Sequence, residues 1–289
     1  MKPSKFAYAV PTTLASAVEL RARDDDSVIL NGGQSLVATM NFRLSNPDLV
    51  IDLRKVGELD YITVAEDTVR VGATTKQRTV ELDPSVHRAN PLIREVLQNV
   101  AHPVVRNRGS IGGSLAHADP SAELPTLLAT LRGVITAQGP SGRRVIAASD
   151  FFEHIFATAL ELDELLVEAA FPVLEADEGW SFSEFARRHG DYAVAGVAVT
   201  VKLGADGLLS RVRMGACGIA TVPMVLSECE ELLTGNRPTA ELFARAGELA
   251  REAVTASDDS ATSKAYRQHV LAGLVQKNLE RAMTRVGGA

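Results

Sequence analysis

Two short segments with paired glycines restrict the folds open to this chain more than any other feature of its sequence. Residues 29–36 read ILNGGQSL, so an aliphatic run ends in Gly32 and Gly33, and residues 108–114 read RGSIGGS. Paired glycines can adopt positive φ and, because they lack Cβ atoms, they let an anion approach successive backbone N–H groups. Taken alone, a pair of glycines after a strand is more often an ordinary turn. Two such segments, about eighty residues apart, could hold one diphosphate from two sides.

Other phosphate-binding and catalytic patterns do not occur in the sequence. There is no G-x-G-x-x-G after a strand and no G-x-x-x-x-G-K-[ST], which disfavours a Rossmann domain and a P-loop nucleotidase. Ser114, His117 and Asp119 are triad residue types, but they are crowded into one segment without G-x-S-x-G. The six histidines are scattered, and Cys217 and Cys229 lie twelve positions apart without a C-x-x-C pair. We therefore predict no metal or iron–sulfur site in this chain and no catalytic acid or base.

Composition excludes several partners. Hydrophobic residues make up 46% and charged residues 23%, which is typical of a globular chain. The net charge of −6 argues against nucleic-acid binding, which needs clustered Lys and Arg. The first twenty residues lack the apolar run of a signal peptide, and the longest candidate run, 192–201, is too short to span a membrane. We therefore expect a cytoplasmic protein without a membrane span.

Hydrophobic periodicity predicts a mixture of strands and helices. Strands are predicted at 28–30, 49–53, 68–71, 134–137, 144–147, 163–171, 180–188, 192–203 and 209–217. Helices are predicted at 15–22, 90–101, 124–131, 223–233, 239–256 and 263–285. The first three strands are expected to form a small first lobe. The elements do not alternate as regular βαβ units, which favours an α+β fold over a doubly wound sheet. Two domains are predicted, 1–176 and 177–289, with the boundary near 175–179.

Three blocks of sequence resemble a known family, the medium, FAD-binding subunits of molybdenum hydroxylases, relatives of carbon monoxide dehydrogenase and of the flavin domain of xanthine dehydrogenase. They are residues 31–53, residues 101–123 (AHPVVRNRGSIGGSLAHADPSAE) and residues 184–197 (EFARRHGDYAVAGV). The likeness runs in order through nearly the whole chain. It implies a two-lobed FAD-binding domain of the vanillyl-alcohol-oxidase (PCMH) type, followed by a smaller α+β domain of antiparallel strands and helices.

The resemblance also implies which residues contact FAD. The two glycine segments would bind the diphosphate, Ala101 and His102 would lie beside the cofactor, and Glu123 would lie near its ribose or phosphate end. Leu166 would lie near the ring system and Tyr192 against the isoalloxazine, on which an aromatic ring can stack. The expected contacts are Ile29, Leu30, Asn31, Gly32, Gly33, Gln34, Ser35, Leu36, Ala101, His102, Ser110, Ile111, Gly112, Gly113, Ser114, Glu123, Leu166 and Tyr192.

Three further positions qualify this prediction. Asp119 could accept hydrogen bonds from ribose hydroxyls, but before a proline it could equally cap a helix. Some relatives have His where this chain has Gln34, and Lys where it has Glu184. Neither difference removes a glycine, so FAD binding is still expected, whereas close identity with a carbon monoxide enzyme is not.

The function implied by the resemblance is an electron relay. A large partner subunit would carry a molybdopterin-type molybdenum cofactor, a small partner would carry two [2Fe–2S] clusters, and this chain would carry the FAD that passes electrons to an external acceptor. The complex would be a dimer of heterotrimers. The substrate pocket would lie on another subunit and would take an N-heteroaromatic compound or an aldehyde. The alternatives are a self-contained flavoenzyme of the vanillyl-alcohol-oxidase type and a non-enzymatic nucleotide-binding module.

Overall fold

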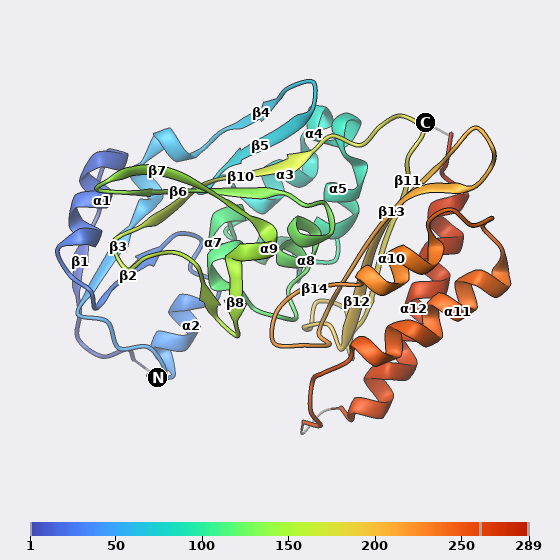
Figure 1. Ribbon diagram of the computed structural model, residues 1–289. Coiled ribbons are helices and arrows are strands. Elements are labelled where there is room, and N and C mark those ends of the chain that lie inside the picture. The colour runs from blue at the N-terminus through green and yellow to red at the C-terminus, as the bar shows by residue number, and fades with distance from the viewer. Residues whose placement is uncertain (1, 260–261, 288–289) are drawn as a thin grey trace.

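The computed structural model describes residues 2–259 and 262–287. These residues form three main sheets of three to five strands. They are a small parallel sheet, an antiparallel sheet beside it, and a second antiparallel sheet towards the C-terminus (Figure 1). The first two sheets and their helices occupy residues 7–172, and the third sheet with its helices occupies residues 179–283. Strands and helices therefore mix as the α+β prediction requires.

The first sheet places the first glycine segment. Its strands are β1 (Ala7–Ala9), β3 (Leu49–Asp52) and β2 (Ser27–Leu30), paired in parallel in that order. Parallel strands of one sheet need a crossover connection, and α1 (Leu14–Ala22) supplies it between β1 and β2, which lie on either side of β3. Thr13 caps α1, since its hydroxyl accepts from the Ser16 N–H at 3.2 Å. The carboxyl end of β2 then leads directly into Asn31 and Gly32.

The second sheet is antiparallel and joins distant parts of the chain. Its order is β4 (Ile62–Val64), β5 (Thr68–Gly72), β10 (Leu165–Pro172), β6 (Val134–Gly139) and β7 (Gly142–Ala147). β5 pairs with β10, with Gly72 opposite Glu168. The prediction that 68–71 belongs to the first lobe with β2 and β3 is therefore wrong. A local pattern identifies a strand but not its partner, and this partner lies about a hundred residues away.

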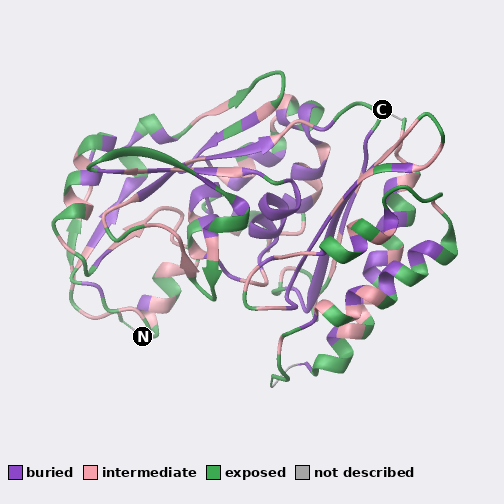
Figure 2. Cartoon of the chain, viewed as in Figure 1, coloured by how far each residue is buried: buried purple, intermediate pink, exposed green. Residues whose placement is uncertain are grey.

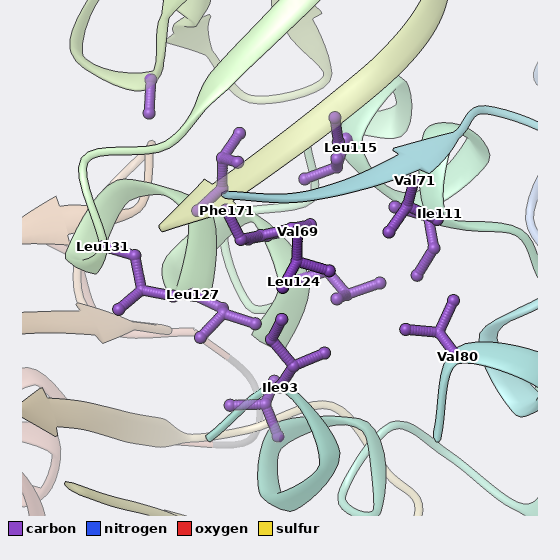
Figure 3. Packing of buried hydrophobic residues seen from close by; sticks show 14 of the residues in the cluster. Val69, Val71, Val80, Ile93, Ile111, Leu115, Leu124, Leu127, Leu131 and Phe171 are labelled. Carbon is purple, nitrogen blue, oxygen red and sulfur yellow. The ribbon is translucent and has the colours of Figure 1, made fainter. Parts of the chain in front are cut away.

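Helices cover one side of this second sheet and form the largest core. They are α3 (Gln77–Leu82), α4 (Pro84–Ala89), α5 (Pro91–Leu97), α6 (Pro103–Arg106), α7 (Ile111–His117), α8 (Glu123–Thr130) and α9 (Ala148–Phe151). Val69 and Val71 of β5 and Phe171 of β10 pack with Ile111 of α7 and Leu124 of α8 (Figure 3). Every residue of α8 is buried, and the helix lies at the centre of the molecule (Figure 2).

The third sheet packs against α8 on one face and against C-terminal helices on the other. Its strands are β11 (Gly179–Phe185), β12 (Ala195–Leu203), β13 (Leu209–Cys217) and β14 (Met224–Val225). Its helices are α10 (Ser227–Leu233), α11 (Ala240–Ala250), the 3-10 turn η3 (Arg251–Ala253) and α12 (Lys264–Met283). The strand β12 is buried on both faces, since Ala198 belongs to the first core while Val197 and Val199 belong to the second.

The remaining short elements connect these strands and helices along the chain. They are α2 (Leu36–Asn41), η1 (Leu53–Lys55), η2 (Gly57–Leu59), β8 (Phe152–His154) and β9 (Ala157–Thr158). The β8–β9 hairpin turns at Phe156, whose φ of 58° is left-handed.

Several predicted boundaries differ from the structure. The helix predicted at 90–101 ends at Leu97, and Ala101 has φ 43°, which no α-helix accommodates. The strand predicted at 180–188 ends at Phe185, and the strand predicted from 192 begins only at Ala195. Residues 223–226 are not helical, because Met224 and its neighbour pair with β13. In the last case strand pairing replaces the helical turn that the local pattern predicts.

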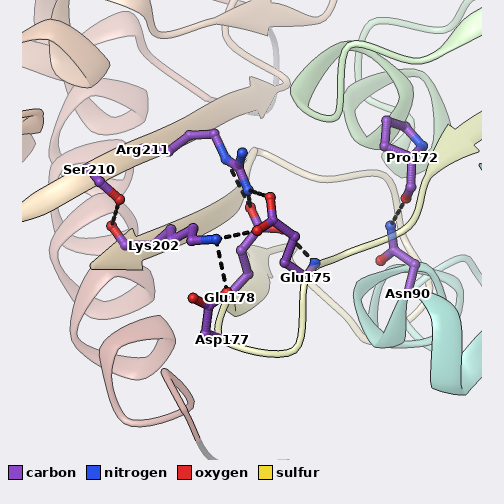
Figure 4. Close-up of polar contacts among 8 residues, drawn as sticks. All are labelled: Asn90, Pro172, Glu175, Asp177, Glu178, Lys202, Ser210 and Arg211. Carbon is purple, nitrogen blue, oxygen red and sulfur yellow. Dashed lines mark hydrogen bonds and ion pairs between the residues drawn. The ribbon is translucent and has the colours of Figure 1, made fainter. Parts of the chain in front are cut away.

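The segment between β10 and β11 is fixed from both sides (Figure 4). Asn90 donates from its Nδ2 to the Pro172 carbonyl at 2.8 Å. On the other side Arg211 binds the buried Glu178 carboxylate at 2.9 Å and Glu175 at 2.6 Å, and Lys202 also binds Glu175. Hydrogen bonds from Lys202 and Arg211 lower the pKa of Glu175 to about 2. This segment is therefore held to both the first part of the chain and the third sheet.

We predict that Arg211→Ala lowers the free energy of unfolding by about 2 kcal/mol, because it leaves the Glu178 carboxylate, 2% exposed, without its cation. Lys202→Ala is the matched control and should cost less than about 1 kcal/mol, because its partners Glu175 and Asp177 are half exposed. Urea unfolding of both variants measures the difference. Equal losses would contradict the prediction.

Candidate functional site

The first glycine segment is a turn with free backbone donors. Gly33 has φ +72°, which L side chains rarely adopt, and α2 begins soon after at Leu36. Within residues 2–259 and 262–287, no acceptor is found for the backbone N–H groups of Gly32, Gly33, Gln34 or Ser35. Adjacent unbonded N–H groups form a concave surface that binds anions. The turn is therefore suited to hold a phosphate or a diphosphate.

The second glycine segment is the start of α7 and not an isolated turn. Ser110 is the N-cap, and its Oγ accepts a hydrogen bond from the Gly113 N–H at 3.2 Å. The N–H groups of Ile111 and Gly112 donate to carbonyls in the segment after β5 at 3.0 Å. A Cβ at Gly112 would lie 2.6 Å from the Ala73 Cβ, so only glycine allows this close packing. The second segment mainly forms one wall of the site, where its glycines allow close approach. The first segment provides most of the backbone N–H groups that have no acceptor.

The two segments contact each other directly. A Cβ at Gly32 would lie 2.6 Å from the Arg108 carbonyl oxygen and 2.8 Å from the Gly109 Cα. Asn31 donates from its Nδ2 to the Ala73 carbonyl at 2.9 Å, which joins the first segment to the end of β5. The fold thus brings together two glycine segments that are far apart in the sequence, as the two-sided arrangement predicted.

A cavity of about 700 Å³ opens beside both segments. This volume suits an organic cofactor or ligand. The predicted contact residues that line it are Ile29, Asn31, Gly32, Gly33, Gln34, Ser35, Leu36, Ala101, Ser110, Gly112, Gly113, Ser114, Glu123, Leu166 and Tyr192.

Three predicted contact residues, Leu30, His102 and Ile111, do not line the cavity. Ile111 is 1% exposed and lies in the first core (Figure 3). The ring of His102 lies 5.8 Å from that of His189, centroid to centroid, and packs on Gly190. Of the last two residues of β2, only Ile29 lines the cavity, and Leu30 does not.

Sequence reasoning missed one whole wall of the cavity. The β8–β9 hairpin and the segment before β10 contribute it, with Phe156, Thr158, Leu160, Glu161, Leu162 and Glu164. Phe156 stacks on His117 with ring centroids 4.8 Å apart, although it is 58% exposed. An exposed apolar side chain in a tight hairpin points to a binding surface, but its exposure cannot be read from the sequence.

The carboxyl groups at the cavity differ in environment. Glu123 is buried, and its burial raises the pKa of its carboxyl group to about 7. Asp119 accepts from the Ser121 N–H at 2.9 Å, whereas the N-cap position of α8 is Ala122. Asp119 therefore closes a turn and does not cap α8, and it lines the cavity. A ligand here meets two carboxyl groups on the same wall.

Tyr192 lies in the loop before β12 at the edge of the cavity. It is 61% exposed. Partial burial of its hydroxyl, together with the negative charge of Asp119, raises the pKa of the phenol. An aromatic side chain left uncovered at a cavity edge can pack against a planar ligand.

The site fits an FAD, because unbonded donors suited to a diphosphate adjoin a cavity with apolar walls such as Leu165 and Leu166. Among the residues that the structure describes, no group of three or more His, Cys, Asp or Glu could hold a metal ion. In the same described ranges no helix is both long enough and apolar enough to cross a membrane.

Comparison with known families identifies the class of protein. The chain matches the FAD binding domain in molybdopterin dehydrogenase over residues 4–174 and the CO dehydrogenase flavoprotein C-terminal domain over residues 180–282. It therefore belongs to the family of FAD-binding medium subunits of molybdenum hydroxylases. This confirms the predicted fold class, the oxidoreductase class and FAD as the cofactor.

Individual relatives match along their full length. The chain is 36% identical to the nicotine 6-hydroxylase medium subunit of Paenarthrobacter nicotinovorans, over 99% of each chain. It is 34% identical to the caffeine dehydrogenase subunit beta of Pseudomonas sp. (strain CBB1), over 99% of this chain and 97% of that one. In carbon monoxide dehydrogenase from Hydrogenophaga pseudoflava, a chain of known structure matches with a TM-score of 0.96 and 32% identity, over 99% of this chain and 100% of that one.

We predict that Gly32→Ala weakens FAD binding at least about tenfold, a loss of roughly 1.4 kcal/mol. The added Cβ would lie 2.6 Å from the Arg108 carbonyl oxygen and push the two glycine segments apart. Gly57→Ala is the control, since a Cβ there meets nothing within 4 Å. Titration of the FAD-free protein with FAD measures the affinity. Unchanged affinity in Gly32→Ala would show that this contact does not shape the site.

We predict that Tyr192→Ala weakens FAD binding only modestly, by about 1 kcal/mol, because stacking adds to an anchor that the glycine turn provides. The flavin absorption spectrum and the rate of reoxidation by oxygen should change, since one face of the site becomes open. Tyr266→Ala is the control, because Tyr266 is also exposed and packs against Phe185 of β11. It should leave the spectrum and the reoxidation rate unchanged. An unaltered spectrum and reoxidation rate in Tyr192→Ala would remove Tyr192 from the site.

Proposed function

We propose that this chain is the FAD-carrying electron-relay subunit of a molybdenum hydroxylase complex, accepting electrons from iron–sulfur clusters of a partner and passing them to an external acceptor. The observation that carries the proposal is the direct contact between the two glycine segments beside a cofactor-sized cavity, in a chain that belongs to the FAD-binding family over residues 4–174. Bound FAD would supply the chemistry, because a flavin exchanges electrons one or two at a time.

The residues of the chain would bind and orient the cofactor. The N–H groups of Gly32, Gly33, Gln34 and Ser35 would hold the diphosphate, and Ser110 to Ser114 would form the opposite wall. Leu166 and Tyr192 would lie at the ring system. The other proposed contacts are Ile29, Asn31, Leu36, Ala101 and Glu123, which line the same cavity.

The partners would be a small subunit with two [2Fe–2S] clusters and a large subunit with a molybdopterin-type cofactor, assembled as a dimer of heterotrimers in the cytoplasm. In support, the chain covers 97% of the 6-hydroxypseudooxynicotine dehydrogenase complex subunit alpha of Paenarthrobacter nicotinovorans, to which it is 36% identical. The oxidised substrate would be an N-heteroaromatic compound. Relatives named for nicotine and caffeine are 36% and 34% identical, whereas a glyceraldehyde dehydrogenase medium chain is 28% identical.

Two measurements on the purified single chain test this division of labour. Heat or acid should release non-covalent FAD. The loaded chain should be reduced by dithionite and reoxidised by an acceptor such as a quinone, but an N-heteroaromatic substrate should reduce it only when both partner subunits are added. Release of FMN would contradict the diphosphate site. Reduction of the single chain by substrate would instead identify a self-contained flavoenzyme.

A further inference from the structure

A row of side chains on the third sheet faces α8. Glu184 on β11 lies opposite Gly196 on β12, and Gly196 lies opposite Cys217 on β13. A Cβ at Gly196 would lie 2.7 Å from the Cys217 Sγ and 3.1 Å from the Glu184 Cβ, so the two side chains close over the glycine. Phe182, on the same face as Glu184, belongs to the first core. Glu184 therefore points towards the FAD-binding part of the chain.

The polar side of α8 meets this row. Glu123, Thr126 and Thr130 lie on one side of the helix and are all buried. A Cβ at Gly215 of β13 would lie 2.3 Å from the Thr130 Oγ1, so the helix and the sheet are in close contact. The Thr126 and Thr130 hydroxyls donate to the carbonyls one helical turn earlier, at 3.1 and 2.7 Å. A hydroxyl has one proton to donate, so neither threonine stabilises a nearby carboxylate.

Among the residues that the structure describes, no Lys, Arg or His forms an ion pair with Glu123 or Glu184. The Glu184 Oε2 is buried without a hydrogen-bonding partner, and no other residue of the described chain donates to the Glu123 carboxyl group. The Arg106 guanidinium is bound by Glu81 at 2.7 Å and by the Val100 carbonyl at 2.8 Å. An unpaired buried carboxylate is strongly disfavoured relative to its neutral acid.

Other charged groups on the surrounding elements do not change the preference of the two carboxyl groups for the neutral form. Asp119 raises the pKa of Glu123 and Arg106 lowers it, but burial has the largest effect and the pKa is about 7. Burial and then Glu123 raise the pKa of Glu184 to about 8.

The other titratable neighbours are uncharged or already paired. On α5, Glu95 accepts from the Phe182 N–H at 2.9 Å and binds Arg285 of α12 at 2.6 Å. The pKa of the Cys217 thiol is raised and that of His117 on α7 is lowered, both mainly by burial, so each of these groups favours its neutral form.

We propose that Glu123 and Glu184 form one protonated carboxyl pair between the two parts of the chain, and that FAD binding is coupled to keeping this pair protonated. The coupling rests on the proposed FAD site, because Glu123 lines that cavity. An incoming diphosphate brings negative charge and excludes water, and both effects favour the neutral acid. By linkage, FAD then binds with uptake of a proton, and its affinity falls as the pH rises through 7 to 8.

The pair is tested first without FAD. A group with a raised pKa in the folded state binds protons there that the unfolded state has already lost, so stability falls as the pH rises from about 5 to about 8. The Tm of the wild type should decrease over this range, and Glu184→Gln should remove a large part of the decrease. Glu231→Gln, at an exposed position on α10, should behave as the wild type. Equal pH dependence in wild type and Glu184→Gln overturns the proposal.

If Glu184→Gln does not fold, the infrared spectrum of the wild type tests whether the pair is protonated. A carbonyl band of a protonated carboxylic acid that disappears between pH 6 and about pH 9 supports the pair. A spectrum without such a band at pH 6 overturns it.

The coupling is tested by titrating FAD into the chain between pH 6 and about pH 8.5. The Kd should rise by up to about tenfold per pH unit above the pKa for one linked proton, and calorimetry in buffers of different ionisation enthalpy should show proton uptake. Binding that is independent of pH overturns the coupling while the proposed function stands. If FAD does not bind at any pH, the proposed function and the coupling are both overturned. The Tm measurements without FAD then still test the carboxyl pair by itself.

Discussion

The structure depends on one backbone contact that leaves no room for a side chain. Gly32 lies against the backbone at Arg108 and Gly109, and a Cβ there would come within 2.6 Å of a carbonyl oxygen. The contact joins the parallel sheet to the start of α7. It fixes the unbonded N–H groups of residues 32–35 at one edge of the cavity. The cavity therefore exists because two distant segments meet where neither carries a side chain.

The helix α8 connects the cavity to the C-terminal part of the chain. It is buried along its whole length, between the second sheet on one side and β12 and β13 on the other. Its first residue, Glu123, lines the cavity, while Thr130 touches Gly215 of the third sheet. This arrangement also explains why a carboxyl group at the cavity can interact with Glu184 on the third sheet.

Much of the candidate site could be predicted from the sequence, because glycine pairs are local and their backbone chemistry does not depend on context. Most residues of both segments line the cavity, together with Ala101, Glu123, Leu166 and Tyr192. Ile111 and His102 could not be excluded in advance, because the direction of a side chain depends on α7 and on the loop at Gly190. The wall around Phe156 was missed because nothing in a short hairpin indicates what it covers.

The sequence by itself determined the element types, the mixed α+β character and the two glycine segments, since periodicity and the absence of Cβ atoms are properties of short stretches. Tertiary structure alone decided that β5 pairs with β10, that the second glycine segment is a capped helix, and that Glu123 lies near enough to Glu184 to raise the pKa of its carboxyl group. These outcomes depend on which surfaces are buried together. Burial joins residues that are far apart in the chain, and no local pattern contains that information.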